Sequence, residues 1–365
     1  MGPEHCRICE KPALIAECLG ICSSCIGERF GDALSHITAA HARSRAPFSL
    51  PTSVPRDRGG AVCSQCTNAC RISEGGVGFC GVRSNINGEV GHVLGTDAIV
   101  QCYYDPLPTN CVAGWTCAAT GRGYPRYSYD KGGEWGYRNL AVFYCACSFD
   151  CLYCQNWHYR RVLKERSAVL SPDALASMVD RRTACICYFG GDPTPQIDHA
   201  LETSRTALER TTDRILRICW ETNGSMSPAL AEKAFELSLS SGGCMKFDLK
   251  AYSDNLHIAL TGVSNKRTLG NFRRLAKRAG ERDPPPLIAS TLIVPGYVDA
   301  EEVRAIASFI ASLNPEIPYA LLAFHPDFMM MDLPTTSRNE AEAALSAATS
   351  AGLRNVRLGN VHLLG

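Results

Sequence analysis

A group of cysteines near the middle of the chain constrains its structure more than any other feature. Residues 144–157 read YCACSFDCLYCQNW, in which Cys147, Cys151 and Cys154 are spaced C-x3-C-x2-C. Three thiolates this close together can hold three irons of a [4Fe–4S] cluster and leave the fourth iron open for a substrate or cofactor. The alternative is a structural zinc loop, but zinc loops use paired C-x2-C knuckles and a closed shell of four ligands. The spacing therefore favours a cluster that binds something at iron.

The charge and cysteine content limit the kinds of protein this chain can be. Its 365 residues are 45% hydrophobic, contain 20 cysteines and carry a net charge of +1, which argues against nucleic acid or an anionic membrane as a partner. No apolar run approaches the ~18 residues that a membrane-spanning helix needs, and the first residues lack the order of a signal peptide. Cysteines without an export signal favour metal ligation over disulfides, so we expect a cytoplasmic, oxygen-sensitive protein.

Residues 1–50 carry a first set of cysteines in two C-x2-C pairs: Cys6, Cys9, Cys22 and Cys25. Each pair turns the backbone so that two sulfurs face one metal, and two pairs complete a tetrahedron. This pattern predicts a zinc-ribbon-like region in which the metal has a structural role. Residues 42–60 are rich in Pro, Ser, Arg and Gly and predict a linker with solvated arginines.

Residues 51–138 form a second cysteine-rich region that we expect to be rich in loops. Its second set of cysteines is spaced C-x2-C-x3-C and continues into GGVGFCGVRSN: Cys63, Cys66, Cys70 and Cys80. Glycines in the last segment let the backbone turn back so that all four sulfurs can reach one metal centre. Zinc and an auxiliary [4Fe–4S] cluster both fit, with zinc slightly preferred. Residues 93–140 lack helical periodicity and predict a loop-rich lid or collar.

Residues 139–365 form the largest expected domain, in which short apolar runs alternate with amphipathic segments. The apolar runs predict six strands, over residues 140–146, 184–189, 214–220, 244–249, 287–294 and 318–324. Helices are expected between them, with start signals at Ser171–Pro172, Ser227–Pro228 and Asp299, and a last helix over 338–351. This alternation predicts a parallel sheet, and six units are too few for a closed eight-stranded barrel. We therefore predict an α/β fold with an open (β/α)6 partial barrel.

Polar or glycine-containing motifs follow the expected strands. The first strand is followed by residues 144–157, which we call the cysteine loop. The motifs after the other five strands are FGGDPTPQ, WETNG, KFDLK, VPGY and AFHP, at residues 189–196, 220–224, 246–250, 294–297 and 323–326. Parallel sheets gather the carboxyl ends of their strands at one edge, where such folds place their chemistry. The sequence therefore predicts a functional site at that edge.

The cysteine loop and two later segments, DLKAYSDNLHIALTGVSNKRTL and TLIVPGYVDAEE, resemble the radical S-adenosylmethionine (SAM) enzymes related to pyruvate formate-lyase activating enzyme. The resemblance spans about residues 144–326. The C-x2-C-x3-C…GFCGVRSN block resembles the AmmeMemoRadiSam-system radical SAM enzymes. The resemblance implies a [4Fe–4S] cluster that binds SAM and cleaves it reductively to methionine and a 5′-deoxyadenosyl radical. It also implies an electron donor such as flavodoxin or ferredoxin.

The family's roles carry over to matched positions. Cys147, Cys151 and Cys154 would ligate the cluster. The positions that would lie at SAM are Tyr153, Gly190, Gly191, Asp192, Pro193, Glu221, Asn223, Asp248, Lys250 and His325. Among these, the GGD segment would receive the amino group of SAM and Lys250 its carboxylate, while Asp248, Glu221 and Thr222 would lie near a monovalent cation. The chain departs from the family where Asp replaces the Glu of GGEP and Glu replaces the Asp of DTNG.

Three functions fit these features. The first is a radical SAM enzyme that abstracts hydrogen from a protein or peptide, such as a glycyl-radical enzyme. The second is a radical SAM enzyme that acts on a small molecule or RNA, with the N-terminal region as a docking module. The third is an iron–sulfur electron carrier without SAM turnover, which the open iron and the GGDP motif disfavour. Because minimal activating enzymes lack the two extra cysteine regions, the substrate need not be a glycyl-radical enzyme.

Overall fold

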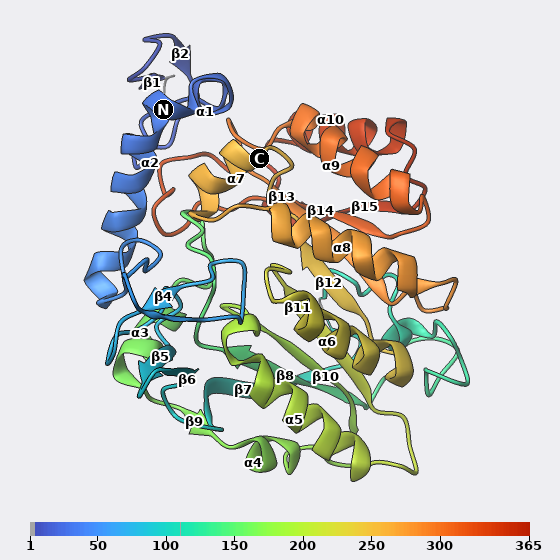
Figure 1. Ribbon diagram of the computed structural model, residues 1–365. Helices are drawn as coiled ribbons and strands as arrows, with labels where there is room; N and C mark the ends of the chain where they lie inside the picture. The colour runs from blue at the N-terminus through green and yellow to red at the C-terminus, as the bar shows by residue number, and fades with distance from the viewer. Residues whose placement is uncertain (1–3, 110) are drawn as a thin grey trace.

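A nine-stranded, mostly parallel sheet forms the centre of the protein. Figure 1 shows the computed structural model, which describes residues 4–109 and 111–365. The strand order is β15-β14-β13-β12-β11-β10-β8-β7-β9. The six expected strands are present and pair in parallel: β8 (Arg138–Tyr144), β10 (Thr183–Gly190), β11 (Arg217–Thr222), β12 (Met245–Asp248), β13 (Leu287–Ile293) and β14 (Tyr319–Ala323). The predicted α/β class with a parallel central sheet is confirmed.

Helices connect these strands and cover the sheet. They are α3 (Tyr159–Glu165), α4 (Pro172–Ala176), α5 (Ile197–Glu209), α6 (Pro228–Ser241), α7 (Asp254–Thr261), α8 (Lys266–Ala279), α9 (Ala300–Leu313) and α10 (Arg338–Ser350). The predicted starts of α4 and α9 are confirmed, because Ser171 accepts a hydrogen bond from Ala174 N–H, and Asp299 accepts two from the first turn of its helix. Helices α5, α6 and α8 lie side by side over the sheet (Figure 1).

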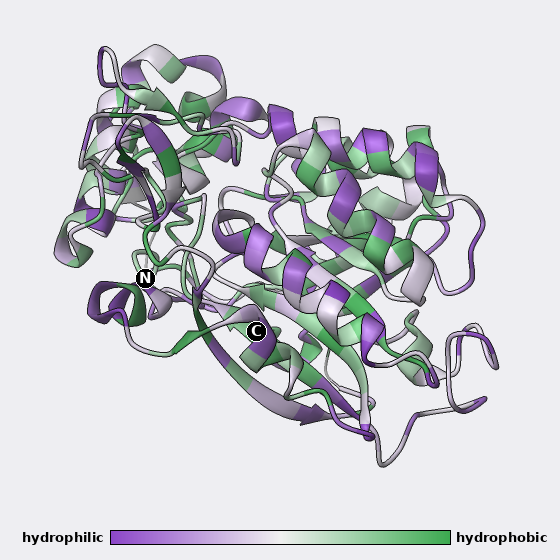
Figure 2. Cartoon of the chain, turned by 60° about the horizontal axis from the view of Figure 1, so that its bottom comes forward, coloured by the Kyte–Doolittle hydropathy of each residue, from purple (hydrophilic) through white to green (hydrophobic). Residues whose placement is uncertain are grey.

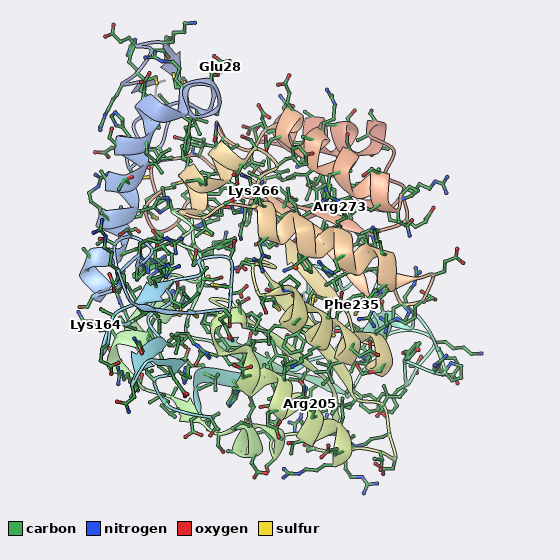
Figure 3. All side chains as sticks on the ribbon, viewed as in Figure 1. Glu28, Lys164, Arg205, Phe235, Lys266 and Arg273 are labelled. Atoms are coloured by element: carbon green, nitrogen blue, oxygen red, sulfur yellow. The ribbon has the colours of Figure 1, made fainter. Side chains whose placement is uncertain are left out.

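The helices bury one face and expose the other. Figure 2 shows hydrophobic residues along the central strands and bands of hydrophilic residues on the surrounding helices. Arg205 of α5 and Arg273 of α8 are exposed, whereas Phe235 of α6 is fully buried (Figure 3). This one-sided pattern is what a helix packed on a sheet requires. Within the described residues, none of the helices is long and apolar enough to cross a membrane.

Three strands extend the sheet beyond the six expected units. At one edge β7 (Ala98–Pro106) pairs antiparallel with β8 and with β9 (Val169–Leu170), and at the other β15 (Val356–Gly359) pairs in parallel with β14. The expected loop-rich lid or collar over residues 93–140 therefore also contains a strand, β7, that was not predicted. Its first three residues are buried, and its later residues alternate weakly in exposure, so polar neighbours concealed the strand signal.

The N-terminal region consists of a small hairpin followed by helices. The elements are β1 (Glu4–His5), β2 (Pro12–Ala13), α1 (Ser23–Glu28), α2 (Phe30–Arg45) and the 3-10 turn η1 (Ala46–Phe48). Helix α2, blue in Figure 1, runs along one side of the sheet domain. The expected linker therefore starts inside α2. Its arginines are not all solvated, since Arg45 is 1% exposed.

The second cysteine-rich region is made of short hairpins. In these hairpins β3 (Ala61–Val62) pairs with β4 (Arg71–Ile72), and β5 (Arg83–Ile86) pairs with β6 (Glu89–His92). Later parts of the chain contain the short 3-10 turns η2 (Ala118–Thr120), η3 (Thr194–Gln196) and η4 (Val361–Leu363). The loop between β3 and β4 is fixed to the sheet domain, because Thr67 N–H donates to Ser225 O at 2.9 Å. The backbone of Cys66 also forms an isolated antiparallel β-bridge with that of Met226, in the loop after β11.

The motif after β13 attaches the N-terminal region to the sheet domain. The hydroxyl of Tyr297 accepts a hydrogen bond from Ala16 N–H at 3.0 Å and donates to Ile21 O at 3.1 Å. Gly296 has φ +80°, and a Cβ there would lie 2.4 Å from Leu14 O. This strand-end motif therefore serves packing, contrary to the expectation that all of them line a functional site.

We predict that Gly296→Ala destabilises the protein. The new methyl group would collide with the Leu14 carbonyl, and the backbone would keep a positive φ, which together cost about 1–3 kcal/mol. The measurement is the free energy of unfolding in denaturant. Gly270→Ala is the control, because Gly270 lies in α8, where an added Cβ would meet no neighbouring part of the structure within 4 Å. This substitution should stabilise the protein slightly. Equal stability of the two variants would show that the N-terminal region does not dock through Gly296.

Candidate active site at the carboxyl ends of the parallel strands

A cavity lies where the parallel strands β8, β10, β11 and β12 end. Most of the site residues expected from the sequence line it: Cys147, Cys151, Tyr153, Cys154, Gly190, Gly191, Asp192, Glu221, Thr222, Asn223, Asp248 and Lys250. Two expected residues stand apart. His325 is exposed and outside the lining, because the chain turns away after β14, and Pro193 is buried behind the wall.

Backbone hydrogen bonds hold the cysteine loop in place. Asp150 N–H donates to Thr261 O at 2.8 Å, and Leu152 N–H donates to Leu260 O at 3.0 Å, which ties the loop to the end of α7. Gly191 N–H donates to Tyr144 O at 2.9 Å and so closes the loop against the next strand. The three cysteines are therefore fixed on a rigid frame.

Of the three cysteines of the loop, Cys151 is buried, whereas Cys147 and Cys154 are half-buried. Burial raises the pKa of Cys147 and Cys154, and it raises the pKa of Cys151 to about 12. Each thiol is therefore protonated at neutral pH until a metal replaces its proton. Ligation then releases protons and leaves thiolates in a dry setting.

The glycines of the GGDP motif are required by a close approach of two chain segments. Gly190 has φ +112°, and a Cβ there would lie 2.7 Å from Tyr144 N. A Cβ on Gly191 would lie 2.3 Å from Ala146 O. The side chains that these glycines lack would therefore collide with the cysteine loop and not first with a ligand. The motif brings the wall of the cavity against the cysteine loop.

Asp192 joins the ends of two strands. Its carboxylate accepts hydrogen bonds from Thr194 N–H at 2.8 Å, Thr222 Oγ1 at 3.0 Å and Asn223 N–H at 2.7 Å. Burial raises the pKa of Asp192, although these hydrogen bonds oppose the shift. The carboxylate is thus occupied by protein donors, and the short Asp side chain suits this position between β10 and β11.

Unpartnered polar atoms in the cavity fit a charged ligand. Lys250 forms an ion pair with Asp248, and its Nζ lies 5.8 Å from the centre of the Tyr153 ring. Within the described residues, Asp248 Oδ1 and the Tyr153 hydroxyl are buried without a hydrogen-bond partner. A buried polar atom without a partner is costly, and one that lines a cavity can be satisfied by a ligand bound there. Three thiols beside an ammonium and a carboxylate fit a cluster and the amino-acid end of SAM.

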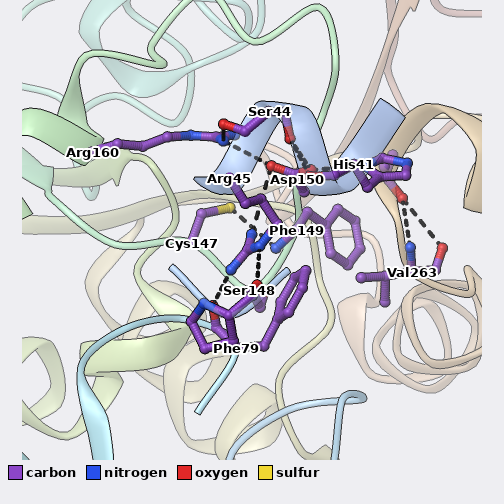
Figure 4. A network of polar contacts seen from close by, with 12 residues as sticks. His41, Ser44, Arg45, Phe79, Cys147, Ser148, Phe149, Asp150, Arg160 and Val263 are labelled. Carbon is purple, nitrogen blue, oxygen red and sulfur yellow. Dashed lines mark hydrogen bonds and ion pairs between the residues drawn. The ribbon is translucent and has the colours of Figure 1, made fainter. Parts of the chain in front are cut away.

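A buried carboxylate beneath the cysteines was not anticipated from the sequence. Asp150 lies between Cys147 and Cys151 and is fully buried (Figure 4). Its Oδ1 lies 2.8 Å from Arg160 Nη1 and 3.6 Å from Arg45 Nη1. Four polar contacts thus converge on this side chain, since its Oδ2 also meets two further groups of helix α2, described below.

Helix α2 supplies the remaining contacts to Asp150. His41 Nδ1 lies 2.7 Å from Oδ2, and Ser44 Oγ donates to the same oxygen at 2.5 Å. Burial alone would raise the pKa of Asp150, but the His41 hydrogen bond and the two arginine charges outweigh it and lower the pKa. The charge of Arg160 also acts on Cys154, where it opposes the effect of burial on the pKa of that thiol. The N-terminal region is therefore part of the site. The only sequence signal was an aspartate inside an otherwise apolar loop.

A second chamber adjoins the cavity. Phe189, Glu221 and Lys246 line both spaces, and the second is otherwise bounded by the strands and by the segment that includes η2. Lys246 forms an ion pair with Glu221 and lies 2.9 Å from Cys111 Sγ. An ammonium group therefore already stands beside Glu221, one of the residues expected near a monovalent cation.

The first cysteine set forms a separate candidate metal centre. The sulfurs of Cys6, Cys9, Cys22 and Cys25 all lie within 4.8 Å of one another, and those of Cys9 and Cys22 are 3.9 Å apart. Metal–sulfur bonds of about 2.3 Å in a tetrahedron place sulfurs about 3.8 Å apart. This set therefore fits one metal ion, as the zinc-ribbon-like pattern predicts.

We predict that Asp150→Asn weakens the cysteine loop. The change leaves Arg45 and Arg160 buried without their carboxylate, which costs about 3–5 kcal/mol of folding free energy. Unfolding in denaturant and the iron content after anaerobic reconstitution should both fall. Asp32→Asn, which removes an exposed ion pair of α2, is the matched control and should change neither. An Asp150→Asn variant with native stability and iron content would rule out this role.

Comparisons with known proteins agree with this geometry. Residues 141–310 match the sequence profile of the radical SAM superfamily. An uncharacterized protein of Methanocaldococcus jannaschii is 26% identical over 314 residues, which cover 82% of this chain and 81% of that protein. The isethionate sulfite-lyase activating enzyme of Oleidesulfovibrio alaskensis is 34% identical over 144 residues, covering 38% of this chain and 41% of the enzyme. The chain thus spans less than half the length of that activating enzyme.

One solved structure is similar in part. A domain of pyruvate-formate lyase-activating enzyme from Bacteroides vulgatus aligns at 19% identity and a TM-score of 0.39, over 48% of this chain and 98% of that one. The sequence profile and the cavity at the strand ends cover the same segment of the chain. Residues 141–310 thus match the radical SAM superfamily, and the residues of the cavity fit a [4Fe–4S] cluster and SAM.

Proposed function

We propose that this protein abstracts hydrogen from a protein or peptide substrate, as glycyl-radical activating enzymes do. The observation that carries the proposal is one cavity that combines the three cysteines with Asp248 and Lys250. The relative named as an isethionate sulfite-lyase activating enzyme supports a polypeptide substrate. The two extra cysteine regions set this chain apart from minimal activating enzymes, so the polypeptide need not be a glycyl-radical enzyme.

The side chains divide the work of such a reaction. When bound, the reduced cluster with SAM supplies methionine and a 5′-deoxyadenosyl radical, which takes a hydrogen atom from the substrate. Cys147, Cys151 and Cys154 would hold three irons. Lys250 and Asp248 would present opposite charges to the carboxylate and amino groups of SAM, and so would hold its sulfonium in one place. The buried walls exclude water, which protects a reactive species.

The substrate's reacting group would enter through the second chamber. That chamber meets the cavity at Phe189, Glu221 and Lys246, so a group placed there lies next to the SAM position. Its other walls are mostly apolar and carry thiols, including Cys187 and Cys219. A chain segment with a small side chain suits such a narrow, dry space better than a charged nucleotide. Flavodoxin or ferredoxin is the proposed electron donor.

We predict that the protein forms 5′-deoxyadenosine from SAM under anaerobic conditions with dithionite. Cys147→Ala should reduce the product at least 100-fold, because an iron loses its ligand. Cys145→Ala should retain it, since the Cys145 thiol is buried in the apolar cluster next to the loop and its hydrogen bond goes to the Phe143 carbonyl. Chromatography of the quenched reaction measures the product. If wild-type protein with an intact cluster forms no 5′-deoxyadenosine, the hydrogen-abstraction function is excluded and the electron-carrier function is favoured.

We predict that macromolecules, and not small molecules, stimulate this reaction. A lysate of the source cells is divided by ultrafiltration, and each fraction is added to the anaerobic assay. The retained fraction should raise 5′-deoxyadenosine formation at least tenfold, and protease treatment should remove the effect. Stimulation by the filtrate, or a retained activity that ribonuclease destroys, would favour the small-molecule or RNA function instead.

A further inference from the structure

The second cysteine set differs in geometry from the first. Within the described residues, the first set forms the one group of three or more Cys, His, Asp or Glu side chains whose ligand atoms all lie within 4.8 Å. The sulfurs of Cys63, Cys66, Cys70 and Cys80 are therefore spread more widely, as are those of the cysteine loop. One tetrahedral ion draws four sulfurs to about 3.8 Å, whereas a cubane of four irons and four sulfides holds its thiolates farther apart. The sulfurs of the first set are thus close together, and those of the second set, which we call the wide set, are farther apart.

The surroundings of the wide set suit an iron–sulfur cluster. Cys63 and Cys70 are buried, and Ile72 and Phe79 are buried beside them in the same apolar core. Phe79 N–H donates to Cys70 Sγ at 3.5 Å, a contact that stabilises negative charge on sulfur. The β3–β4 hairpin brings two of the ligands together, since Cys63 N–H donates to Cys70 O at 2.8 Å. Two of the four cysteines are therefore buried and two are half-buried, and one of them accepts from a backbone donor; burial and such hydrogen bonds set the potential of a cluster.

One contact joins the second set directly to the cysteine loop. Asn68 lies between Cys66 and Cys70, and its Nδ2 donates to Ser148 O at 2.7 Å. Ser148 follows Cys147 in the chain, and both Asn68 and Ser148 are buried. The two loops that carry the cysteines are therefore joined directly by this hydrogen bond.

Arg45 forms a second connection between the two sets. Its guanidinium donates to Phe79 O, one residue before Cys80, and lies 3.5 Å from the centre of the Phe79 ring. The same guanidinium lies 3.6 Å from Asp150 Oδ1, one residue before Cys151 (Figure 4). Cys80 also packs against the apolar cluster that contacts Cys147 and Cys154. The two sets are thus adjacent over a buried interface that contains a fixed positive charge.

From this arrangement we infer that Cys63, Cys66, Cys70 and Cys80 hold a second, fully ligated [4Fe–4S] cluster that passes electrons to the cluster of the cysteine loop. A low-potential one-electron donor, of the flavodoxin or ferredoxin class, reduces the second cluster by one electron and is itself oxidised by one. That electron then moves to the cysteine-loop cluster, with no bond made or broken. For this second set we therefore now favour a [4Fe–4S] cluster over the zinc ion that the sequence slightly favoured. The relay step rests on the proposed function, whereas the cluster itself does not.

Acid-labile sulfide tests the cluster independently of SAM chemistry, because neither zinc nor a single iron at the first cysteine set contributes sulfide. After anaerobic reconstitution the wild-type chain should contain about eight sulfides, and the Cys147→Ala/Cys151→Ala/Cys154→Ala variant about four. Adding Cys66→Ala and Cys80→Ala to that variant should bring the count near zero. Adding Cys102→Ala and Cys185→Ala instead should leave it at about four, since these thiols belong to neither set.

A wild-type count of about four that falls to zero in the triple variant, with zinc at the second set, would overturn the inference. Because the triple variant alters a buried loop, Cys66→Ala/Cys80→Ala is also measured alone and should contain about half of the wild-type sulfide. The relay is tested in this variant through the ratio of 5′-deoxyadenosine formed with flavodoxin to that formed with dithionite. The ratio should fall at least tenfold, and an unchanged ratio would exclude the relay.

Discussion

The buried carboxylate of Asp150 is the interaction on which the site depends. It lies inside the cysteine loop, yet it is contacted from two other parts of the chain: helix α2 supplies His41, Ser44 and Arg45, and helix α3 supplies Arg160. A buried carboxylate is stable only when its charge is balanced and its oxygens are hydrogen-bonded. The position of the cysteine loop therefore depends on helix α2 and the start of α3. The N-terminal region is thus structural support for the site and not a separable module.

The strand-end motifs have two kinds of role. Those after β8, β10, β11 and β12 form the cavity, and Asp192 joins two of them. The motif after β13 instead docks the N-terminal region through Gly296 and Tyr297. Both roles place groups at the same edge of the sheet, because that edge is where loops from parallel strands gather. The second cysteine set is therefore held against the cysteine loop, whereas the first set is docked through the motif after β13.

The sequence predicted the parallel strands and most of the cavity residues, because strand periodicity and motif spacing are local signals. It did not predict β7 or the position of His325, which depend on which segments pair or turn away in three dimensions. The Asp150 contacts could not be foreseen either. Arg45 and Arg160 are separated from each other by more than a hundred residues, and each alone reads as a surface arginine. Long-range ion pairs leave no periodic pattern in one sequence.

The central claim is that the cysteine loop leaves one iron open for SAM. The most direct test is electron–nuclear double resonance on the reduced, reconstituted protein, with SAM labelled by ¹⁵N at its amino group and ¹⁷O at its carboxylate. Hyperfine coupling of both labels to the cluster is expected, because the amino-acid end of SAM should chelate the open iron beside Asp248 and Lys250. An intact cluster that shows coupling to neither label would contradict the account.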